Sequence, residues 1–297
     1  MHGFAESVFA LNMKALHIYS SAPFFKYHKN EEFYIEDFDI LSAILSAITW
    51  RKYNGPIKLY ADSTVLKYYK ELGIEDLWNG GIDTETLDKA SKEIDQGVFW
   101  AAGKLFALKK EGAPVLMIDQ DLIVWKNIDH LLAQGDILTF HKEYIDHAYP
   151  PLKDLIVAPG YKPKAQWSWN SLPCNTAVAF IRKQWFLDYY LEHAFEFMKG
   201  NDKPGTEYVT RMVFAEQRIL AMCAGEKRLK VHTCLQNPFQ YENDTFTHIW
   251  GGKTVAREEE GQRYLLCKAL VAKIRQESPD FKPKTIKLAE MFRKYSE

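Results

Sequence analysis

The chain has 297 residues, enough for one large α/β domain or two smaller ones. Its net charge of −1 argues against a nucleic-acid-binding protein, because such proteins usually carry a marked basic excess. The four cysteines form no C-x-x-C pair, which argues against a structural zinc site. In a chain of this length, reduced thiols are a simpler interpretation than a disulfide framework. No apolar run reaches the roughly 18–20 residues of a membrane span, and no signal-peptide pattern is present. We therefore expect a cytoplasmic protein, with at most peripheral contact to the inner face of a membrane.

The first half of the chain alternates between strand and helix patterns. Strands are expected at 14–19, 57–61 and 115–118, and helices at 37–50, 63–72 and 97–110. This alternation indicates βαβ units and a mainly parallel, Rossmann-like α/β sheet flanked by helices. No G-x-G-x-x-G follows any of these strands, so the sequence does not support a dinucleotide-binding fingerprint.

The second half is more mixed and ends in helices. Strands are expected at 136–140 and 176–181, helices at 184–198, 207–223, 257–276 and from 285, and a glycine-rich loop at 248–253. We expect one domain over residues 13–255, a small helical extension over 256–297, and an N-terminal extension at 1–12 outside the fold.

Two aspartates directly follow the apolar strand at 115–118. Asp119 and Asp121 lie two residues apart, so their side chains point the same way if the backbone stays extended. In open α/β sheets, ligands bind outside the carboxyl ends of the strands. Neighbouring carboxylates repel each other unless a cation or a proton joins them, and Mn²⁺ or Mg²⁺ would also bridge to a diphosphate. A bare D-x-D is common, and ending a strand is its simpler explanation.

A second motif, His248-x-x-Gly251-x-Lys253, lies far along the chain. Histidine is a common ligand of first-row metals, glycine permits close backbone approach to a phosphate, and lysine supplies a positive charge. Alone, the motif would be explained by a loop histidine and an exposed lysine. The order of the two motifs along one chain favours a joint metal and diphosphate site.

Together these motifs resemble those of GT-A glycosyltransferases, and most of all the glycogenin and bacterial lipopolysaccharide galactosyltransferase family. The resemblance implies a GT-A fold, a UDP-sugar donor and Mn²⁺ or Mg²⁺ as cofactor. It implies that Asp121 and His248 hold the metal, and that Asp119 binds the metal, the ribose or both. Gly251 and Lys253 would contact the diphosphate.

The resemblance extends to residues that would surround the donor sugar. Asn175 precedes a strand similar to one in the family and would hydrogen-bond the sugar, although Ala177 stands where glycine is usual. Glu216 and Gln217 match an Asp-Gln pair that lies near the reacting sugar in the family. The resemblance thus places Asp119, Asp121, Glu216, Gln217 and Asn175 in the catalytic part of the site.

The resemblance also implies the remaining donor contacts and the reaction. Lys104 would face the phosphates or the sugar, and Ser20, Ser21 and Asp62 would lie near the nucleoside. The implied reaction is a retaining hexosyl transfer to a hydroxyl of a glycan or glycolipid, as in polysaccharide biosynthesis. From the residues themselves, the Trp167–Trp169 loop is the favoured acceptor contact.

Two other functions stay open at this point. A sugar-nucleotide or glycan-binding protein of the same fold would bind UDP without turnover. A phosphotransferase or phosphatase would use the aspartate pair as its nucleophile. The second fits less well, since such pairs usually follow the first strand and precede a small hydroxyl residue, whereas Leu122 follows Asp121 here.

Overall fold

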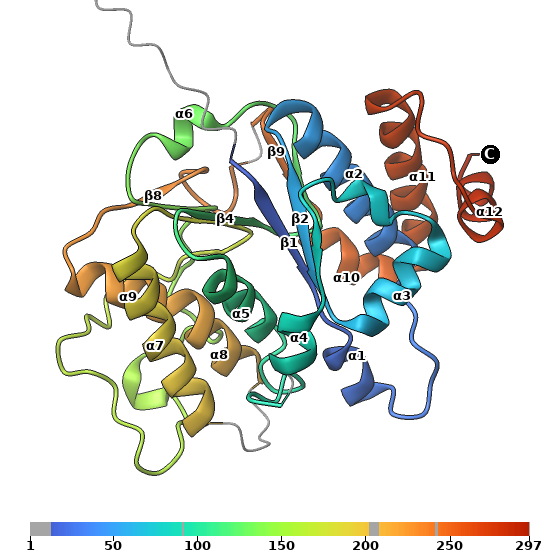
Figure 1. Ribbon diagram of the computed structural model, residues 1–297. Coiled ribbons are helices and arrows are strands. Elements are labelled where there is room, and N and C mark those ends of the chain that lie inside the picture. The colour runs from blue at the N-terminus through green and yellow to red at the C-terminus, as the bar shows by residue number, and fades with distance from the viewer. Residues whose placement is uncertain (1–12, 91, 202–207, 241–242, 297) are drawn as a thin grey trace, which may run out of the picture.

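The computed structural model describes residues 13–90, 92–201, 208–240 and 243–296. The expected extension at 1–12 lies outside the described residues. A seven-stranded sheet forms the centre of the molecule, in the order β3-β2-β1-β4-β7-β6-β8 (Figure 1). Its strands are β1 (Ala15–Tyr19), β2 (Ile57–Ala61), β3 (Ile82–Asp83), β4 (Val115–Ile118), β6 (Ile137–Thr139), β7 (Val178–Ile181) and β8 (Val231–Thr233).

Every neighbouring pair in this sheet is parallel except the two that involve β7, which runs antiparallel to β4 and to β6. The carboxyl ends of β1, β2, β4, β6 and β8 therefore meet at one edge, where β7 begins. A second, two-stranded antiparallel sheet joins β5 (Leu122–Val124) to β9 (Phe246–His248).

Helices cover both faces of the central sheet (Figure 1). The first half contributes α1 (Ala22–Tyr27), α2 (Asp37–Tyr53), α3 (Ser63–Leu72), α4 (Glu85–Ala90), α5 (Ala102–Glu111) and α6 (Asp129–Leu132). The second half contributes α7 (Gln184–Gly200), α8 (Tyr208–Val213), α9 (Ile219–Glu226), α10 (Trp250–Glu258), α11 (Glu260–Glu277) and α12 (Ile286–Lys294). Between α8 and α9 the helix widens into a π turn, Phe214–Arg218.

The apolar core divides into two clusters, one on each face of the sheet. Successive residues of β1 point to opposite faces, so Ala15 packs with α2 and the C-terminal helices while Leu16 packs with α5 and α7. The predicted fold class is confirmed: a mainly parallel α/β sheet flanked by helices, with further helices at the C-terminal end. Among the described residues, no helix is both long enough and apolar enough to cross a bilayer.

Local signals fix several of these elements where they were expected. The Asp62 side chain caps α3 by accepting a hydrogen bond from the backbone N–H of Val65 at 3.0 Å. Gly73 ends the same helix with a φ of 68°, a left-handed conformation that suits glycine. Thr285 caps α12 in the same manner as Asp62 caps α3, through the N–H of Leu288.

Several predicted elements differ from the structure. The predicted helix start at residue 97 is wrong, because α5 begins at Ala102 after a series of turns. The two-residue strand β3 was not predicted, so the strand before Asp119 is the fourth of the chain rather than the third. The predicted glycine-rich loop at 248–253 is also wrong, since α10 begins at Trp250.

The C-terminal helices pack onto the rest of the fold. Helix α10 continues past residue 255, and the buried side chains of Cys267 and Ile274 on α11 join the same core as α2. The division of the chain into a domain at 13–255 and a helical extension stays a prediction.

Candidate metal and diphosphate site

Asp119, Asp121 and His248 form one group at the carboxyl edge of the sheet. Their side-chain ligand atoms all lie within 4.8 Å of one another. The structure thus brings together the three residues predicted as metal ligands, from segments more than 120 residues apart in the sequence. Two carboxylates and one imidazole are a suitable donor set for a divalent first-row metal or Mg²⁺. The group could hold a metal ion, and the metal ligation by these residues stays a prediction.

The backbone explains why these side chains meet. Asp119 follows β4, and its N–H donates a hydrogen bond to the carbonyl of Ala177 at 2.9 Å, which ties it to β7. In the small sheet, Leu122 pairs with His248, and the N–H of Ile249 donates to the carbonyl of Asp121 at 3.0 Å. The β5–β9 pairing therefore places the late histidine beside the second aspartate.

The Asp121 side of the group is an ion-pair chain. His248 Nε2 lies 3.5 Å from Asp121 Oδ1, and Lys253 Nζ lies 2.9 Å from Asp121 Oδ2. Lys253 also contacts Asp39 Oδ1 at 2.6 Å, and Arg257 lies 3.6 Å from the other oxygen of Asp39. We call these residues the Asp121 cluster.

The charges in this cluster shift the pKa values of its members. Burial acts to raise the pKa of Asp121, but the hydrogen bond from His248 and the charge of Lys253 outweigh it and hold that pKa well below its usual range. Burial acts to lower the pKa of Lys253, and the charges of Asp121 and Asp39 raise it above its usual value. Both groups are therefore ionised at neutral pH.

The Asp119 side of the group has its own lysine. Lys104 Nζ lies 2.7 Å from Asp119 Oδ1 and 3.0 Å from Glu216 Oε1. The hydroxyl of Thr176 donates a hydrogen bond of 2.6 Å to the same oxygen of Glu216. Burial acts to lower the pKa of Lys104, but the charges of Asp119 and Glu216 raise it well above its usual value. We call Lys104, Asp119, Glu216 and Thr176 the Asp119 cluster.

Glu216 and Gln217 lie on the π turn between α8 and α9. The Gln217 Oε1 atom accepts a hydrogen bond from the Tyr149 hydroxyl at 2.5 Å. The buried Arg218 donates to the carbonyls of Tyr149, Pro150 and Trp169. Single π turns of this kind are frequent at functional sites, and this one directs Glu216 inward towards Lys104.

Asn175 lies three residues before β7, in the segment whose Ala177 carbonyl accepts the hydrogen bond from the Asp119 N–H. Its Nδ2 donates a hydrogen bond to Glu143 Oε1 at 2.8 Å, and its Oδ1 accepts one from the N–H of Ala177 at 3.0 Å. The amide is thus fixed in orientation by both neighbours. Its predicted contact with a donor sugar stays a prediction.

The three residues predicted to lie near a nucleoside meet at the ends of β1 and β2. Asp62 Oδ2 accepts a hydrogen bond from the N–H of Ser21 at 2.5 Å and one from the hydroxyl of Ser20 at 3.2 Å. Asp62 therefore ties the turn after β1 to the start of α3, which is a structural role. A nucleoside contact by these residues stays a prediction.

The correction at 248–253 changes the environment of the late motif. Gly251 and Lys253 lie in the first turns of α10, where backbone N–H groups and the helix dipole favour an anion. A Cβ added at Gly251 would meet no other atom within 4 Å, so packing inside the protein does not require a glycine there. This leaves room for a ligand to approach the backbone at Gly251.

Sequence reasoning missed the second partner of Lys253. Asp39 lies in the first turn of α2, where an acidic residue is explained by the helix dipole alone.

Sequence reasoning also missed a chain of buried polar side chains that leads to the segment after the aspartates. Trp78 Nε1 donates a hydrogen bond to His17 Nδ1 at 3.2 Å, and His17 Nε2 lies 3.1 Å from Ser46 Oγ. The Ser46 hydroxyl in turn donates to the carbonyl of Leu122 at 2.6 Å.

Three solved structures show a weak overall similarity to the chain, and all are described as glycosyltransferases. PaToxG glycosyltransferase has a TM-score of 0.39 and 13% identity over 95% of this chain and 84% of that chain. Mouse xyloside xylosyltransferase 1 has a TM-score of 0.36 and 12% identity over 74% of this chain and 84% of that chain. The bifunctional glycosyltransferase WbbM has a TM-score of 0.42 and 10% identity over 95% of this chain and 51% of that chain, so this chain spans about half its length.

Among curated proteins, no significant match is found. A protein-family model does match, over residues 13–287, which is most of the chain. The chain therefore belongs to DUF6734, a family of unknown function.

Proposed function

We propose that the chain is a metal-dependent GT-A glycosyltransferase. It transfers a sugar from a UDP-sugar to a hydroxyl of a glycan or glycolipid, with retention of configuration, as the resemblance of its motifs implies. One observation carries the proposal. Asp119, Asp121 and His248 converge within 4.8 Å, and a lysine lies within 3 Å of each aspartate, Lys104 on one side and Lys253 on the other.

The charges of this arrangement favour a divalent cation. Four carboxylates, those of Asp39, Asp119, Asp121 and Glu216, face three permanently cationic groups, those of Lys104, Lys253 and the more exposed Arg257. Carboxylates in excess at a partly buried site repel one another unless a cation joins them. A divalent ion at the Asp119–Asp121–His248 group would balance that excess. The lysines would then be able to face an anionic ligand.

The diphosphate of a sugar nucleotide fits the other side of such an ion. When bound, the metal would supply Lewis-acid stabilisation of the departing diphosphate. Lys253 and the N-terminal turn of α10 would add positive charge at the same place. Glu216 and Asn175 would lie on the sugar side, each held by hydrogen bonds that fix its orientation.

A thermal-shift panel tests the metal and donor assignments. Unfolding would be followed with UDP, GDP, ADP, UDP-glucose and UDP-galactose, each with and without Mn²⁺. We expect UDP and at least one UDP-sugar to raise the unfolding temperature only when Mn²⁺ is present. Asp121→Ala and His248→Ala are expected to abolish that shift. Asp244→Ala, which removes an exposed carboxylate two residues before β9, is the matched control and should keep it.

Two results would contradict the proposal. If no nucleotide stabilises the wild-type protein, the predicted donor site is wrong. A shift that survives Asp121→Ala and His248→Ala would place the metal elsewhere. Release of UDP from a UDP-sugar with Mn²⁺ would then separate an enzyme from a binding protein of the same fold.

A further inference from the structure

Two exposed aromatic side chains lie together on the surface of the molecule. Tyr144 is 53% exposed and Phe239 is 61% exposed. Their rings are nearly parallel, with centroids 6.4 Å apart and an angle of 18° between the planes. Tyrosine and phenylalanine rings left in water in this way offer flat apolar faces to a ligand.

The pair lies at the same edge of the sheet as the metal group. Tyr144 follows β6 and Phe239 follows β8, and both strands end at the edge where β4 leads into Asp119. The segments are tied together, since the N–H of Leu235 donates to the carbonyl of Phe140 at 2.9 Å. The Phe140 ring packs edge-on against His248, with centroids 5.4 Å apart.

The order of the strands separates this pair from the predicted nucleoside side. Ser20, Ser21 and Asp62 follow β1 and β2, on one side of β4. The aromatic pair follows β6 and β8, on the other side. Glu143, the neighbour of Tyr144, hydrogen-bonds Asn175 between the two regions. A ligand on the aromatic pair would therefore approach the metal group from the side opposite the nucleoside.

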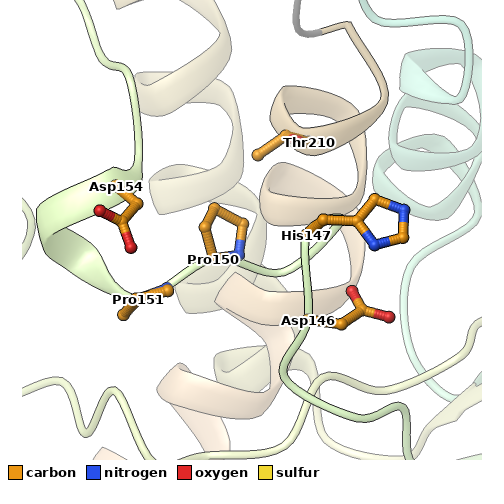
Figure 2. Close-up of a pocket in the computed structure, with 6 residues that line it drawn as sticks. All are labelled: Asp146, His147, Pro150, Pro151, Asp154 and Thr210. Carbon is orange, nitrogen blue, oxygen red and sulfur yellow. The ribbon is translucent and has the colours of Figure 1, made fainter.

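A cavity of about 370 Å³ lies near this pair in the sequence, since its first lining residue, Asp146, comes two residues after Tyr144. Its volume is within the size range of small-molecule sites. Figure 2 shows Asp154 on one side of Pro150 and Pro151, Asp146 and His147 on the other, and Thr210 of α8 above them. The lining offers carboxylate, imidazole and hydroxyl groups beside apolar proline rings. Such a mixture suits a ligand with many hydroxyl groups and apolar C–H faces.

The loop that forms this cavity is fastened to the Asp119 cluster. Tyr149, between the cavity residues, donates its hydroxyl to Gln217, next to Glu216. Arg218 donates to the carbonyl of Tyr149 at 2.9 Å. A ligand in the cavity would therefore be held at a fixed position relative to Glu216.

The tryptophans of the predicted acceptor loop are less suited to stacking on a sugar. Trp167 is buried and packs edge-on against His193. Trp169 stacks on Phe214, with centroids 5.7 Å apart, and the Arg218 guanidinium lies 5.0 Å from its ring centroid. Contacts within the protein therefore already occupy the Trp167 and Trp169 rings.

We propose that the Tyr144–Phe239 pair and the Asp146–Asp154 cavity form the acceptor subsite, and that its occupant is an uncharged glycan. A pyranose ring would stack on the aromatic pair, while its neighbour would donate hydroxyl hydrogen bonds to Asp146 and Asp154. The two carboxylates disfavour acidic sugars, since the lining holds a single imidazole against them. This inference rests on the proposed glycosyltransferase function.

Saturation-transfer NMR tests this subsite with named sugars. Maltotriose, cellotriose and N,N′-diacetylchitobiose would each be offered to the protein with UDP and Mg²⁺, and trigalacturonate would serve as the acidic probe. We expect transfer to ring protons of at least one neutral sugar, and at least fivefold less to trigalacturonate. The double variant Tyr144→Ala, Phe239→Ala should lower the transfer to the neutral sugar at least tenfold.

Two controls keep the test independent of folding and of the donor site. Trp185→Ala removes a comparably exposed ring from α7, which begins at the opposite edge of the sheet, and should leave the transfer unchanged. Asp154→Asn removes one charge from the cavity and should raise the trigalacturonate signal at least threefold. The metal-dependent thermal shift by UDP should persist in all of these variants.

The outcomes separate this inference from the proposed function. If UDP with metal stabilises the protein but no neutral sugar shows transfer, the acceptor subsite is wrong and the donor site stands. The same holds if transfer survives the double aromatic variant. If UDP with metal does not stabilise the wild-type protein, the proposed function itself fails, and the acceptor inference fails with it.

Discussion

The Asp119 and Asp121 clusters flank the same metal group but are built differently. In the Asp121 cluster, one aspartate oxygen faces His248 and the other contacts Lys253, and the side chain is 12% exposed. In the Asp119 cluster, the Asp119 side chain is 24% exposed, and Lys104 contacts one of its oxygens. The same lysine also contacts Glu216. The comparison indicates that the Asp121 side chain is held more firmly than the Asp119 side chain, which has one cationic contact and is more exposed.

The largest expected effect is on catalysis. Its absence would contradict the difference inferred between Asp121 and Asp119. Asp121→Ala should lower the kcat/KM for UDP release from a UDP-sugar by about 100- to 1,000-fold, on the order of 3–4 kcal/mol of transition-state stabilisation. Asp119→Ala should cost about tenfold less, because its side chain is less tightly fixed. Steady-state kinetics with Mn²⁺ would measure both, and a larger loss in Asp119→Ala would reverse the assignment.

The next effect separates metal binding from diphosphate binding. His248→Gln should weaken Mn²⁺ binding on the order of 10- to 100-fold, since it replaces an imidazole ligand by an amide. Lys253→Met should instead leave Mn²⁺ binding nearly unchanged and weaken UDP binding in the presence of the metal. Calorimetric titrations of metal and then of UDP would distinguish them, and equal losses of metal affinity would show that Lys253 acts on the metal.

A third prediction concerns the Asp119 cluster and its stability. Lys104→Met would leave Asp119 and Glu216 as neighbouring carboxylates without their shared cation. We expect a loss of roughly 2–3 kcal/mol in the free energy of unfolding, partly because a mostly buried ion pair loses one partner. Mn²⁺ should restore more stability to this variant than it adds to the wild-type protein. Denaturant unfolding with and without Mn²⁺ would show it, and equal metal effects would contradict it.

A fourth prediction concerns pH and sharpens the account of Asp121. Its pKa in the folded state lies well below its usual range, so its ionised form stabilises the fold at pH values above the unfolded pKa of about 3.9. That contribution is lost as the pH falls below about 4. The stability difference between the wild-type protein and Asp121→Asn, measured without metal, should therefore be constant near pH 6–7 and shrink below pH 4. A difference that grows in acid would contradict the sign.

The smallest expected effect tests the second partner of Lys253. Asp39→Asn should change the KM for a UDP-sugar by roughly threefold, close to the size of a partly exposed ion-pair effect. Asp37→Asn is the matched control, since it lies on the same helix and contacts Tyr295 at 2.5 Å instead. If both variants behave alike, Asp39 has no particular role at the site.

The sequence predicted the positions of Asp119 and Asp121 because both stand in a local pattern. Asp119 and Asp121 follow a strand whose four residues are all buried, and that strand is readable from its apolar run. The contact between Lys104 and Glu216 was not predicted, because 112 positions separate the two residues and the resemblance placed each of them only near the donor. The π turn that directs Glu216 inward has no sequence signal of its own.

Sequence analysis missed other features because the local sequence indicated something else or too little. The glycine pair at 251–252 predicted a loop, but both residues lie in the first turn of α10 despite their low helix propensity. Strand β3 has two residues, too few to show any periodicity. Asp39 could be explained fully by its position at a helix start, so its contact with Lys253 was visible only in three dimensions.

The most direct test of the central claim is the position of Mn²⁺ in a crystal of the protein grown with MnCl₂ and UDP. Anomalous diffraction at the manganese edge would locate the ion without reference to the rest of the map. We expect the peak among Asp119, Asp121 and His248, with the UDP diphosphate between it and the first turn of α10. A peak elsewhere, or UDP bound at this edge with no metal near these three residues, would contradict the account.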